Sequence, residues 1–322
     1  MTDKKRALIT GGTGFLGRHL GLRMRELGYE VFLGGRNNKL NQEAQAISGC
    51  EAVPMDVASI ESVRDAVVRT RPDVIVHAAA TKFVDLAEKF PLECVDINVL
   101  GSQNVARVAV DRGVSVVLGI STDKASPPVR NLYGLSKAVM ERTFCYLDAT
   151  SSTRFACVRY GNVAWSTGSV LCVWSKMLRD RGIIGTTGPE MRRFFFTVDD
   201  AVGLVLTALD RMDTIHGRVL GREMKAAKVG DLLDVWKKHD GIRYEVIAGR
   251  PGERNDEYLV GDIELPYARE LDLGGIRHFL IGFNDRVKEP LTNPLSSENA
   301  QPLTEQEILT LLRNPPPGAV PA

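Results

Sequence analysis

The first half of the chain alternates short apolar segments with segments of amphipathic helical pattern, and this alternation constrains the fold more than any other feature. We expect buried strands at residues 7–10, 30–33, 51–54, 74–77, 114–120 and 154–158. We expect helices between them at residues 15–27, 60–69, 95–112 and 136–149. Strands covered on both faces are apolar throughout, and a repeated strand–helix order produces a parallel sheet. The sequence therefore predicts an α/β fold with a doubly wound parallel sheet.

The pattern changes after residue 162, where Gly, Pro and Arg become frequent and the expected helices, at residues 198–209 and 229–236, are isolated. We interpret residues 1–163 as one domain. Residues 164–322 mainly form a second, smaller α/β domain, from which some helices return to the core of the first. The proline-rich residues 315–321 are expected to fray.

Composition excludes several classes of protein. A formal net charge of +1 indicates neither a nucleic-acid-binding nor a membrane-surface protein. No apolar run approaches the about 18 residues typical of a membrane span, and no signal peptide is predicted. The 5 cysteines are scattered without paired metal-ligand spacing, so we expect reduced core thiols, no metal and a cytoplasmic protein.

The segment TGGTGFLG at residues 10–17 lies between the first expected strand and the first expected helix. Gly11 permits a tight turn, Gly14 allows close approach of a pyrophosphate, and Gly17 permits close helix–strand packing. This context is typical of a Rossmann dinucleotide-binding site. The remaining residues of the predicted cradle are Thr13, Phe15 and Leu16.

The end of the second strand favours NADP over NAD. NAD enzymes usually place an acidic residue there to bind the ribose 2′-hydroxyl, whereas this chain has Arg36, which could pair with a 2′-phosphate. Asp56 and Val57, after the third strand, are expected to contact the adenine. The run Ala78, Ala79 and Ala80 leaves room for the dinucleotide beside the fourth strand. Residues 1–163 are thus predicted to be an NADP-binding Rossmann domain.

A candidate catalytic set follows the fifth strand. Tyr133 and Lys137 are four residues apart, which places them on one face of a helix. An ammonium group beside a tyrosine lowers the pKa of the phenol, which could then remove a hydroxyl proton while hydride leaves the same carbon for NADP. Lys137 would also reach the nicotinamide ribose, and Thr122 would bind the substrate oxygen.

Asp123 and Lys124 suggest a further step. An acid and a base beside Thr122 suit elimination, because oxidation to a ketone acidifies the adjacent C–H bond. Neighbouring residues of a regular strand point to opposite faces, so this hypothesis requires the chain to leave strand geometry at Thr122. The alternative is a solvated Asp–Lys pair on the surface.

Taken together, these motifs resemble the inverting UDP-N-acetylglucosamine 4,6-dehydratases, which are extended short-chain dehydrogenases/reductases of polysaccharide and flagellin-sugar biosynthesis. The STDKA segment at residues 121–125 is the most specific match. The resemblance is to the short, soluble branch and covers nearly the whole chain. Further matching segments are HAAATK (77–82), PLECVDINV (91–99), NLYGLSK (131–137), VRYGNV (158–163), PEMRRFFF (189–196), RPGER (250–254), SSEN (296–299) and LTEQEI (303–308).

The resemblance implies a role for each matching position. Tyr133 would deprotonate the C4 hydroxyl, Lys124 would act as base at C5, and Asp123 would act as acid for loss of the C6 hydroxyl. Hydride would return to C6, and C5 would be inverted. The resemblance also implies that the partner is a nucleotide sugar, that residues 164–322 bind it, and that the protein is a homo-oligomer. The implied substrate-binding residues are Lys82, Asn162, Arg193, Arg250 and Glu253.

Three departures from the family pattern leave the sugar open. They are the WSTGS segment at residues 165–169, the extra charge of Arg192, and the NDE segment at residues 255–257. A nucleotide-sugar epimerase acting at C4 or C5 is the main alternative, because the same scaffold serves both reactions. A non-catalytic NADP-binding protein is the other, although mere binding does not need an activated phenol.

Overall fold

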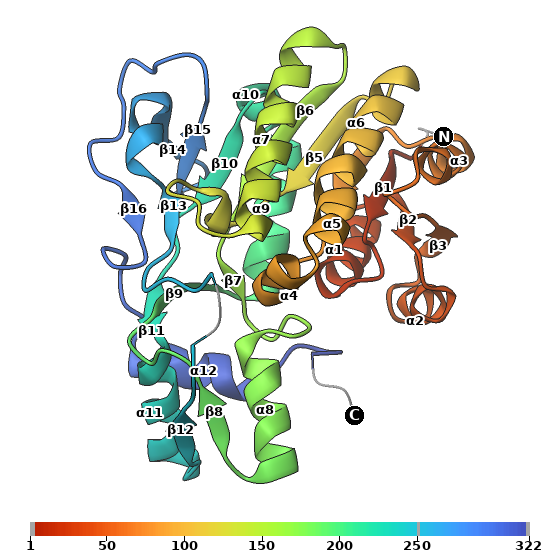
Figure 1. Ribbon diagram of the computed structural model, residues 1–322. Coiled ribbons are helices and arrows are strands. Elements are labelled where there is room, and N and C mark those ends of the chain that lie inside the picture. Colours follow the sequence, from red (N-terminus) through yellow and green to blue (C-terminus); the bar gives the residue numbers. More distant parts are fainter. Residues whose placement is uncertain (1–3, 250–251, 320–322) are drawn as a thin grey trace.

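The computed structural model describes residues 4–249 and 252–319. Its centre is a nine-stranded sheet of order β14-β15-β10-β6-β5-β4-β1-β2-β3 (Figure 1). The strands β1 to β6 and β10 are parallel, whereas β15 and β14 are antiparallel additions at one edge. This architecture confirms the predicted Rossmann-type α/β fold. The strand bounds are β1 Arg6–Thr10, β2 Glu30–Gly35, β3 Glu51–Pro54, β4 Val74–His77, β5 Val116–Ile120, β6 Arg154–Arg159, β10 Val219–Arg222, β14 Ala268–Asp272 and β15 Arg277–Ile281.

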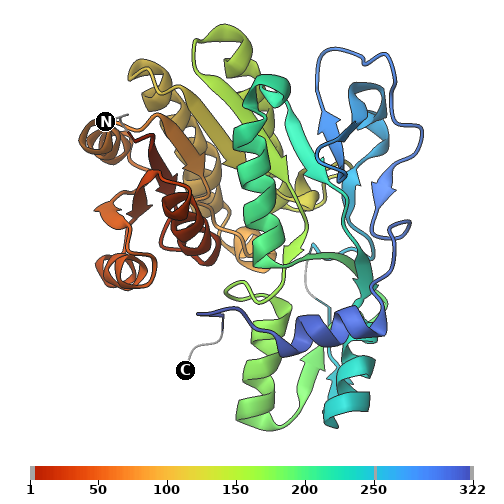
Figure 2. The same ribbon diagram turned by 180° about the vertical axis from the view of Figure 1, so that it is seen from behind.

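Helices cover both faces of this sheet. One face carries α3 (Ile60–Thr70), α6 (Gly101–Asp111) and α7 (Leu132–Thr150). The other carries α1 (Phe15–Glu26) and α9 (Val198–Asp210), which pack together in the view from behind (Figure 2). Each of these helices matches a predicted one, except that residues 95–100 form a π-helical segment, η1 (Val95–Leu100), before α6. Helix α2 (Asn38–Ser48), beside α1, was not predicted individually.

The second half of the chain returns to the sheet more extensively than predicted. Helix α9 is a returning helix of the expected kind, but β10, β15 and β14 also extend the sheet beyond β6. Strand β10 has four residues, and β14 is mostly polar, with only Ala268 buried. The apolar run of β15 is limited to Phe279, Leu280 and Ile281. These strands therefore lack the longer apolar run typical of a buried parallel strand. Between them, a short helix, α10 (Met212–Ile215), follows α9.

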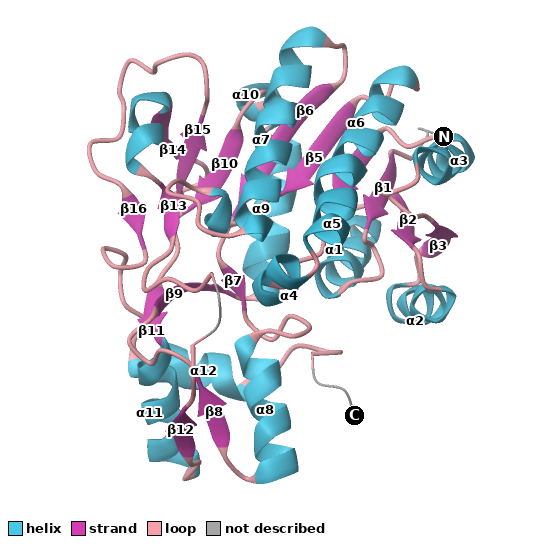
Figure 3. Ribbon diagram, in the orientation of Figure 1, coloured by secondary structure: helices cyan, strands magenta, loops and turns pink. Residues whose placement is uncertain are grey.

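The remaining elements form a smaller lobe beyond the carboxyl ends of the parallel strands (Figures 1 and 3). A three-stranded sheet of order β11-β9-β7 joins this lobe to the large sheet, and helices surround a two-stranded sheet, β12-β8. The bounds are β7 Asn162–Val163, α8 Val170–Arg181, β8 Ile184–Thr186, β9 Arg192–Phe196, β11 Ala226–Lys228, α11 Val229–Asp240, β12 Tyr244–Val246 and α12 Glu305–Arg313. The other elements are α4 Val84–Lys89, α5 Pro91–Cys94, η2 Asp123–Ala125, β13 Tyr258–Val260, η3 Asp262–Tyr267 and β16 Leu295–Ser296. They contact the large part: α4 and α5 pack against α7, β13 contacts η2 and β16, and η3 contacts β14.

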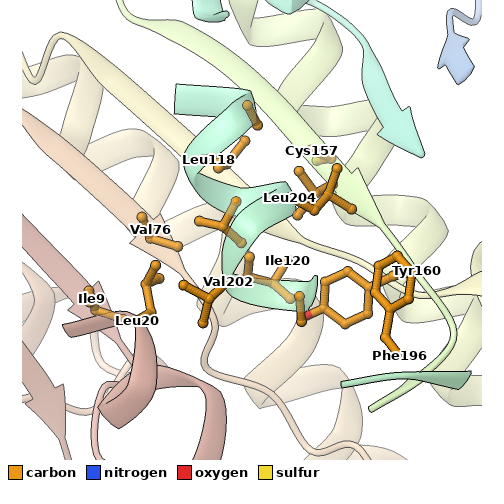
Figure 4. Packing of buried hydrophobic residues seen from close by; sticks show 14 of the residues in the cluster. Ile9, Leu20, Val76, Leu118, Ile120, Cys157, Tyr160, Phe196, Val202 and Leu204 are labelled. Carbon is orange, nitrogen blue, oxygen red and sulfur yellow. The ribbon is translucent and has the colours of Figure 1, made fainter. Parts of the chain in front are cut away.

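The core covers both faces of the sheet, and one part of it lies between the sheet and the helices α1 and α9. Figure 4 shows Ile9, Val76 and Leu118 from three neighbouring strands facing Leu20 of α1 and Leu204 of α9. All five side chains are buried, and each such side chain contributes about 1.5–3 kcal/mol relative to an exposed one. This packing fixes the strands, and therefore the loops at their carboxyl ends.

The chain end differs from the predicted frayed tail. Cys172 Sγ donates a hydrogen bond to the carbonyl of Ala319 at 3.1 Å, and Ala319 is buried. Trp165 Nε1 donates to the carbonyl of Leu311 at 2.6 Å, so α12 is also tied to the loop before α8. For residues 315–319 the expectation was wrong, because composition does not reveal these long-range contacts; residues 320 and 321 lie outside the described residues. Within residues 4–249 and 252–319, no helix has the length and apolarity needed to span a membrane.

Candidate active site

The glycine-rich turn has the shape that a bound dinucleotide requires. Gly11 has a φ of 64°, which favours glycine, and a β-carbon at Gly17 would lie 2.5 Å from the Cα atom of Gly12. Gly14, in contrast, is exposed, and a β-carbon there would approach only the carbonyl of Gly11, at 3.1 Å. The turn is therefore tight on its inner side and open on its outer side. Because Gly14 caps α1 without a side chain, the first amides of α1 remain suited to a pyrophosphate.

The other residues of this turn divide between surface and core. A β-carbon at Gly35 would lie 2.8 Å from the Thr13 side chain, which places Thr13 at the end of β2. Phe15 is buried, with its ring centroid 4.9 Å from that of His19, and Leu16 packs against the core. The side chains of Phe15 and Leu16 therefore pack against the core. Phe15 could bind a phosphate only through its backbone amide.

The loops after β2 and β3 carry the predicted nucleoside contacts. Arg36 is exposed directly before α2, whose first turn is capped by the side chain of Asn37. Asp56 uses Oδ1 to accept a hydrogen bond from the amide of Ala58 at 3.0 Å, which orders the loop. Val57 is buried, and its carbonyl accepts from Asn104 at 3.0 Å. These loops lie at the carboxyl edge, where α/β sheets bind nucleotides.

Buried hydrogen bonds connect the carboxyl ends of β1 and β4. His77 bonds through its two ring nitrogens to Thr10 Oγ1 at 2.7 Å and to Ser102 Oγ at 3.0 Å. Burial lowers the pKa of His77 to about 3, so the ring stays neutral. Thr10 Oγ1 also accepts from the amide of Ala79 at 3.2 Å, at the centre of the partly buried run that comprises Ala78, Ala79 and Ala80. These hydrogen bonds fix the carboxyl ends of β1 and β4 relative to each other, at the point where the strand order reverses.

The chain leaves strand geometry where the elimination hypothesis requires it. Strand β5 ends at Ile120, and Thr122 caps a 3₁₀ turn, η2 (Asp123–Ala125), by accepting from the amide of Lys124. The Thr122 hydroxyl also donates to Asp123 Oδ1 at 2.9 Å. The turn thus directs Thr122, Asp123 and Lys124 into one small region.

Tyr133 and Lys137 both lie in the first turns of α7, as their spacing predicts. Lys137 is buried, and its Nζ donates to the carbonyl of Ile120 at 2.8 Å. Burial lowers the pKa of Lys137 to about 8.

The pKa of Tyr133 differs from the sequence-based expectation. Burial raises it from 10.0 to about 12, against the charge of Lys124 and the hydrogen bond with Thr122, both of which favour the phenolate. The expectation that Lys137 lowers this pKa is therefore wrong for this structure. The loss of hydration of the Tyr133 phenolate outweighs the charges that stabilise it, and the cation that stabilises it most is Lys124.

Asp123 and Lys124 do not form a solvated surface pair, so that alternative is wrong. Asp123 is fully buried, and the Lys124 side chain is 15% exposed. Lys124 Nζ lies 3.1 Å from Asp123 Oδ1, 3.3 Å from Glu257 Oε1 and 3.5 Å from Asn162 Oδ1. Burial alone would lower the pKa of Lys124, but the two carboxylates outweigh it and raise this pKa. Burial raises the pKa of Asp123, and Glu257 adds to that effect.

The substrate-binding residues implied by the resemblance lie in different settings. Asn162 contacts Lys124, and Arg193 Nε lies 4.0 Å from Glu257 Oε1, so both border the catalytic turn. Glu253 instead accepts from Thr187 Oγ1 at 3.1 Å in the small lobe. Lys82 is exposed yet surrounded by enough protein that burial lowers its pKa, as in a concave site. Arg250 lies outside the described residues.

Sequence reasoning missed Glu257, Arg254 and Gly134. Glu257 belongs to the segment that departs from the family pattern, and that departure was the only signal. Arg254 Nε donates to Glu257 Oε2 at 2.5 Å. A β-carbon at Gly134 would overlap the carbonyl of Lys124, so α7 packs directly on the catalytic turn.

Known proteins resemble this chain over most of its length. A family model described as polysaccharide biosynthesis protein matches residues 7–273. The inverting UDP-N-acetylglucosamine 4,6-dehydratase of Campylobacter jejuni is 30% identical, with 84% of this chain and 82% of that protein covered. A UDP-glucose 4-epimerase of Rickettsia conorii is also 30% identical, with 96% of this chain and 95% of that protein covered.

Among solved structures, Pen from Bacillus thuringiensis superposes with a TM-score of 0.88 at 27% identity, over 100% of both chains. The family model spans most of the chain, including the glycine-rich turn and all residues of the catalytic turn and α7. The chain therefore belongs to the polysaccharide biosynthesis protein family, within the extended short-chain dehydrogenases/reductases.

Proposed function

We propose that this protein is an NADP-dependent nucleotide-sugar 4,6-dehydratase that acts on UDP-N-acetylglucosamine with inversion at C5. The observation that carries the proposal is the placement of Asp123 and Lys124. A hydride-transfer site needs Thr122, Tyr133 and Lys137 but no further acid and base. Here a buried carboxyl and a buried ammonium, 3.1 Å apart, share the turn with Thr122.

The residues of the chain divide the reaction between them. Thr122 binds the C4 oxygen, and Tyr133 accepts the C4 hydroxyl proton at its phenolic oxygen. Because burial raises the pKa of Tyr133 to about 12, the phenol must first lose its own proton, a loss that the charge of Lys124 and the hydrogen bond with Thr122 favour.

A dinucleotide held at Gly11, Gly14 and Gly17 would supply the hydride acceptor for C4 and the hydride donor for C6. Lys124 takes the C5 proton, made acidic by the new ketone, and Asp123 gives its proton to the departing C6 hydroxyl, which leaves as water. A proton derived from solvent then adds to the opposite face of C5 as hydride adds to C6, which inverts C5.

Both protonation states follow from the surroundings of these groups. Asp123 has a raised pKa, and its Oδ2 is buried without a hydrogen-bond partner among the described residues. Such a carboxyl is suited to hold a proton and donate it. The raised pKa of Lys124 means that the ammonium must lose its proton before it can act as base, while Asp123 must keep its proton, so dehydration should have a pH profile with a rising and a falling limb.

NADP, rather than NAD, is proposed because Arg36 stands where an acidic residue would bind the free ribose 2′-hydroxyl. Asp56 and Val57 would border the adenine. Arg193 and Asn162, beside the catalytic turn, would hold the sugar-diphosphate end, since a guanidinium can donate two bonds to one anion. Lys82, Glu253 and Arg250 are proposed to complete that site.

A homo-oligomer is also proposed. Helix α7 exposes Leu135, Val139 and Tyr146 at spacings that place them on one face of the helix. Leu92 of α5 and Leu100 of η1 are exposed on the elements that pack beside α7 (Figure 1). A contiguous apolar surface of this kind is typical of a protein–protein interface.

The proposal is tested by incubating the purified protein with UDP-N-acetylglucosamine in heavy water and analysing the product by mass spectrometry and NMR. A dehydratase gives a product that has lost one water and carries one deuterium at C5. The relatives named UDP-glucose 4-epimerase make C4 epimerisation the second candidate. An epimerase would give a C4 epimer without loss of water, and that outcome would overturn the proposal.

A further inference from the structure

A second carboxylate contacts the catalytic lysine from another part of the chain. Glu257 lies directly before β13, and its Oε1 is 3.3 Å from Lys124 Nζ, almost as close as Asp123 Oδ1. The Glu257 side chain is 4% exposed. The ammonium of Lys124 is therefore held between two buried carboxylates, one on each side of the site.

The Glu257 carboxylate is fixed in place. Its Oε2 accepts from Arg254 Nε, and Arg254 Nη2 lies 2.5 Å from the same oxygen. Arg254 is itself anchored through Nη1 to the carbonyl of Pro128 at 2.9 Å, in the loop between the catalytic turn and α7. The amide of Glu257 donates to Ser297 Oγ at 3.0 Å. Glu257 thus connects the substrate side of the molecule to the catalytic turn.

The charges around the two carboxylates are unequal. Glu257 faces three cations, namely Lys124, Arg254 and Arg193, which lies 4.0 Å away on β9. Asp123 has an ion pair with Lys124 and a hydrogen bond from Thr122, and its second oxygen has no hydrogen-bond partner within the described residues. The phenol of Tyr133 on α7 faces Asp123 and Lys124.

This asymmetry decides which carboxyl holds a proton. Burial would raise the pKa of Glu257, but the three cations outweigh it and lower this pKa. The same burial raises the pKa of Asp123, because only one cation opposes it. If one of the two carboxylates takes up a proton, the unequal charges around them favour Asp123, while Glu257, which faces three cations, remains a carboxylate.

We propose that Glu257 is a positioning residue for dehydration: it holds the Lys124 ammonium against Asp123 and, by keeping its own charge, leaves Asp123 as the carboxyl that carries the proton. This proposal rests on the dehydratase function, because Glu257 would position Lys124 and Asp123, which are the base and the acid of the proposed dehydration. Glu257 itself exchanges no proton with the substrate. The C5 proton passes to Lys124, and the proton of Asp123 leaves with the C6 hydroxyl as water.

The test compares Glu257→Gln with the wild-type protein. Removal of the Glu257 charge lowers the pKa of both Lys124 and Asp123, because that charge raises both. We therefore expect both limbs of the pH profile of kcat for dehydration to move to lower pH by about one unit, equivalent to a tenfold change in each protonation equilibrium. We expect kcat at its optimum to fall by about tenfold or more, and KM to change less.

Two variants separate this role from a structural one. Glu257→Asp keeps the charge, so it should restore the wild-type pH profile even if kcat stays low. Glu190→Gln removes an exposed carboxylate of the same lobe, which pairs with Lys228, and should leave both kcat and the profile unchanged. A lowered kcat in Glu257→Gln with the wild-type pH profile would mean that Glu257 merely supports the fold, and would overturn the proposal.

A measurement without turnover keeps this proposal distinct from the proposed function. The ¹³Cε resonance of Lys124, assigned with a Lys124→Ala variant, is titrated in the dinucleotide-bound protein. We expect its pKa to be lower in Glu257→Gln than in wild type. An identical titration in both proteins would overturn the role of Glu257, whereas a wild-type protein that dehydrates no nucleotide sugar would overturn only the proposed function.

Discussion

Gly134 lies directly against the backbone carbonyl of Lys124, with no room for a β-carbon between them. This contact fixes the start of α7 on the turn that follows β5. Because Tyr133 is the neighbour of Gly134, the contact also sets the position of the phenol relative to Thr122, Asp123 and Lys124. One glycine therefore aligns the two segments of the candidate site.

Gly134→Ala should separate these segments. The added methyl group must displace either the turn or α7, so we expect a loss of about 1–3 kcal/mol in the free energy of unfolding and a large loss of dehydration. Urea unfolding and a product assay measure the two effects. Gly203→Ala in α9 is the matched control: no atom lies within 4 Å of its β-carbon position, and alanine should stabilise the helix by about 0.5–1 kcal/mol. Wild-type behaviour of Gly134→Ala would contradict the proposed alignment.

Tyr133→Phe should abolish hydride transfer while dinucleotide binding persists, because the ring remains and only the proton-accepting oxygen is lost. Single-turnover absorbance of the reduced dinucleotide reports the first step, and calorimetry reports binding. Formation of reduced dinucleotide at the wild-type rate would show that another group removes the C4 hydroxyl proton.

Lys124→Ala should retain dinucleotide binding and lose the dehydrated product. It should also lower the free energy of unfolding by about 3–5 kcal/mol, because Asp123 and Glu257 are then buried without their shared cation. Adding Glu257→Gln should recover part of that stability, which denaturant unfolding of the double variant can measure. A Lys124→Ala protein with the full dehydration rate would refute the assignment of Lys124 as base.

Arg36→Glu should exchange the cofactor preference. Loss of a charged contact to the 2′-phosphate should weaken NADP binding by about 10–100-fold, and the new carboxylate can accept from the 2′-hydroxyl of NAD. Titration calorimetry with both dinucleotides measures the change. Arg64→Ala, which removes an exposed arginine of α3 paired with Glu61, serves as control. Equal affinities of wild type for NAD and NADP would contradict the role of Arg36.

The lowered pKa of Lys137 predicts how the free energy of unfolding depends on pH. Its pKa is about 8 in the folded protein and ordinarily 10.5, so between these values the unfolded chain binds more protons than the folded one. The free energy of unfolding of wild type should therefore rise with pH in this interval relative to Lys137→Met, by up to about 3 kcal/mol at 1.36 kcal/mol per pKa unit. Denaturant unfolding at several pH values tests this difference, and a flat difference would mean that Lys137 titrates normally.

Features encoded locally were predictable from the sequence. The apolar segments, the glycine spacing and the four-residue interval between Tyr133 and Lys137 each lie within a few consecutive residues, and periodicity reveals them. The end of β5 before the Asp123–Ala125 turn was deduced as a requirement of chemistry rather than from pattern, and the structure has it.

Features that depend on contacts between distant segments were not predictable. Glu257 is one of many acidic residues until the fold brings it to Lys124. The raised pKa of Tyr133 depends on how much protein surrounds the phenol, whereas sequence spacing reports only that a lysine lies on the same helix face. The sequence does not show that β6 has a further hydrogen-bonded neighbour, so the extension of the sheet by β10, β15 and β14 was not predictable.

The pairing of β10 with β6 has a consequence for any attempt to produce the dinucleotide-binding part alone. A chain that stops near residue 163 would contain β1 to β6 but would leave β6 without its hydrogen-bonded partner. The amide and carbonyl groups along β6 would then form an open, apolar sheet edge, which is a template for intermolecular strand addition. Strand β10 thus protects the molecule from self-association through its own sheet, in addition to extending the fold.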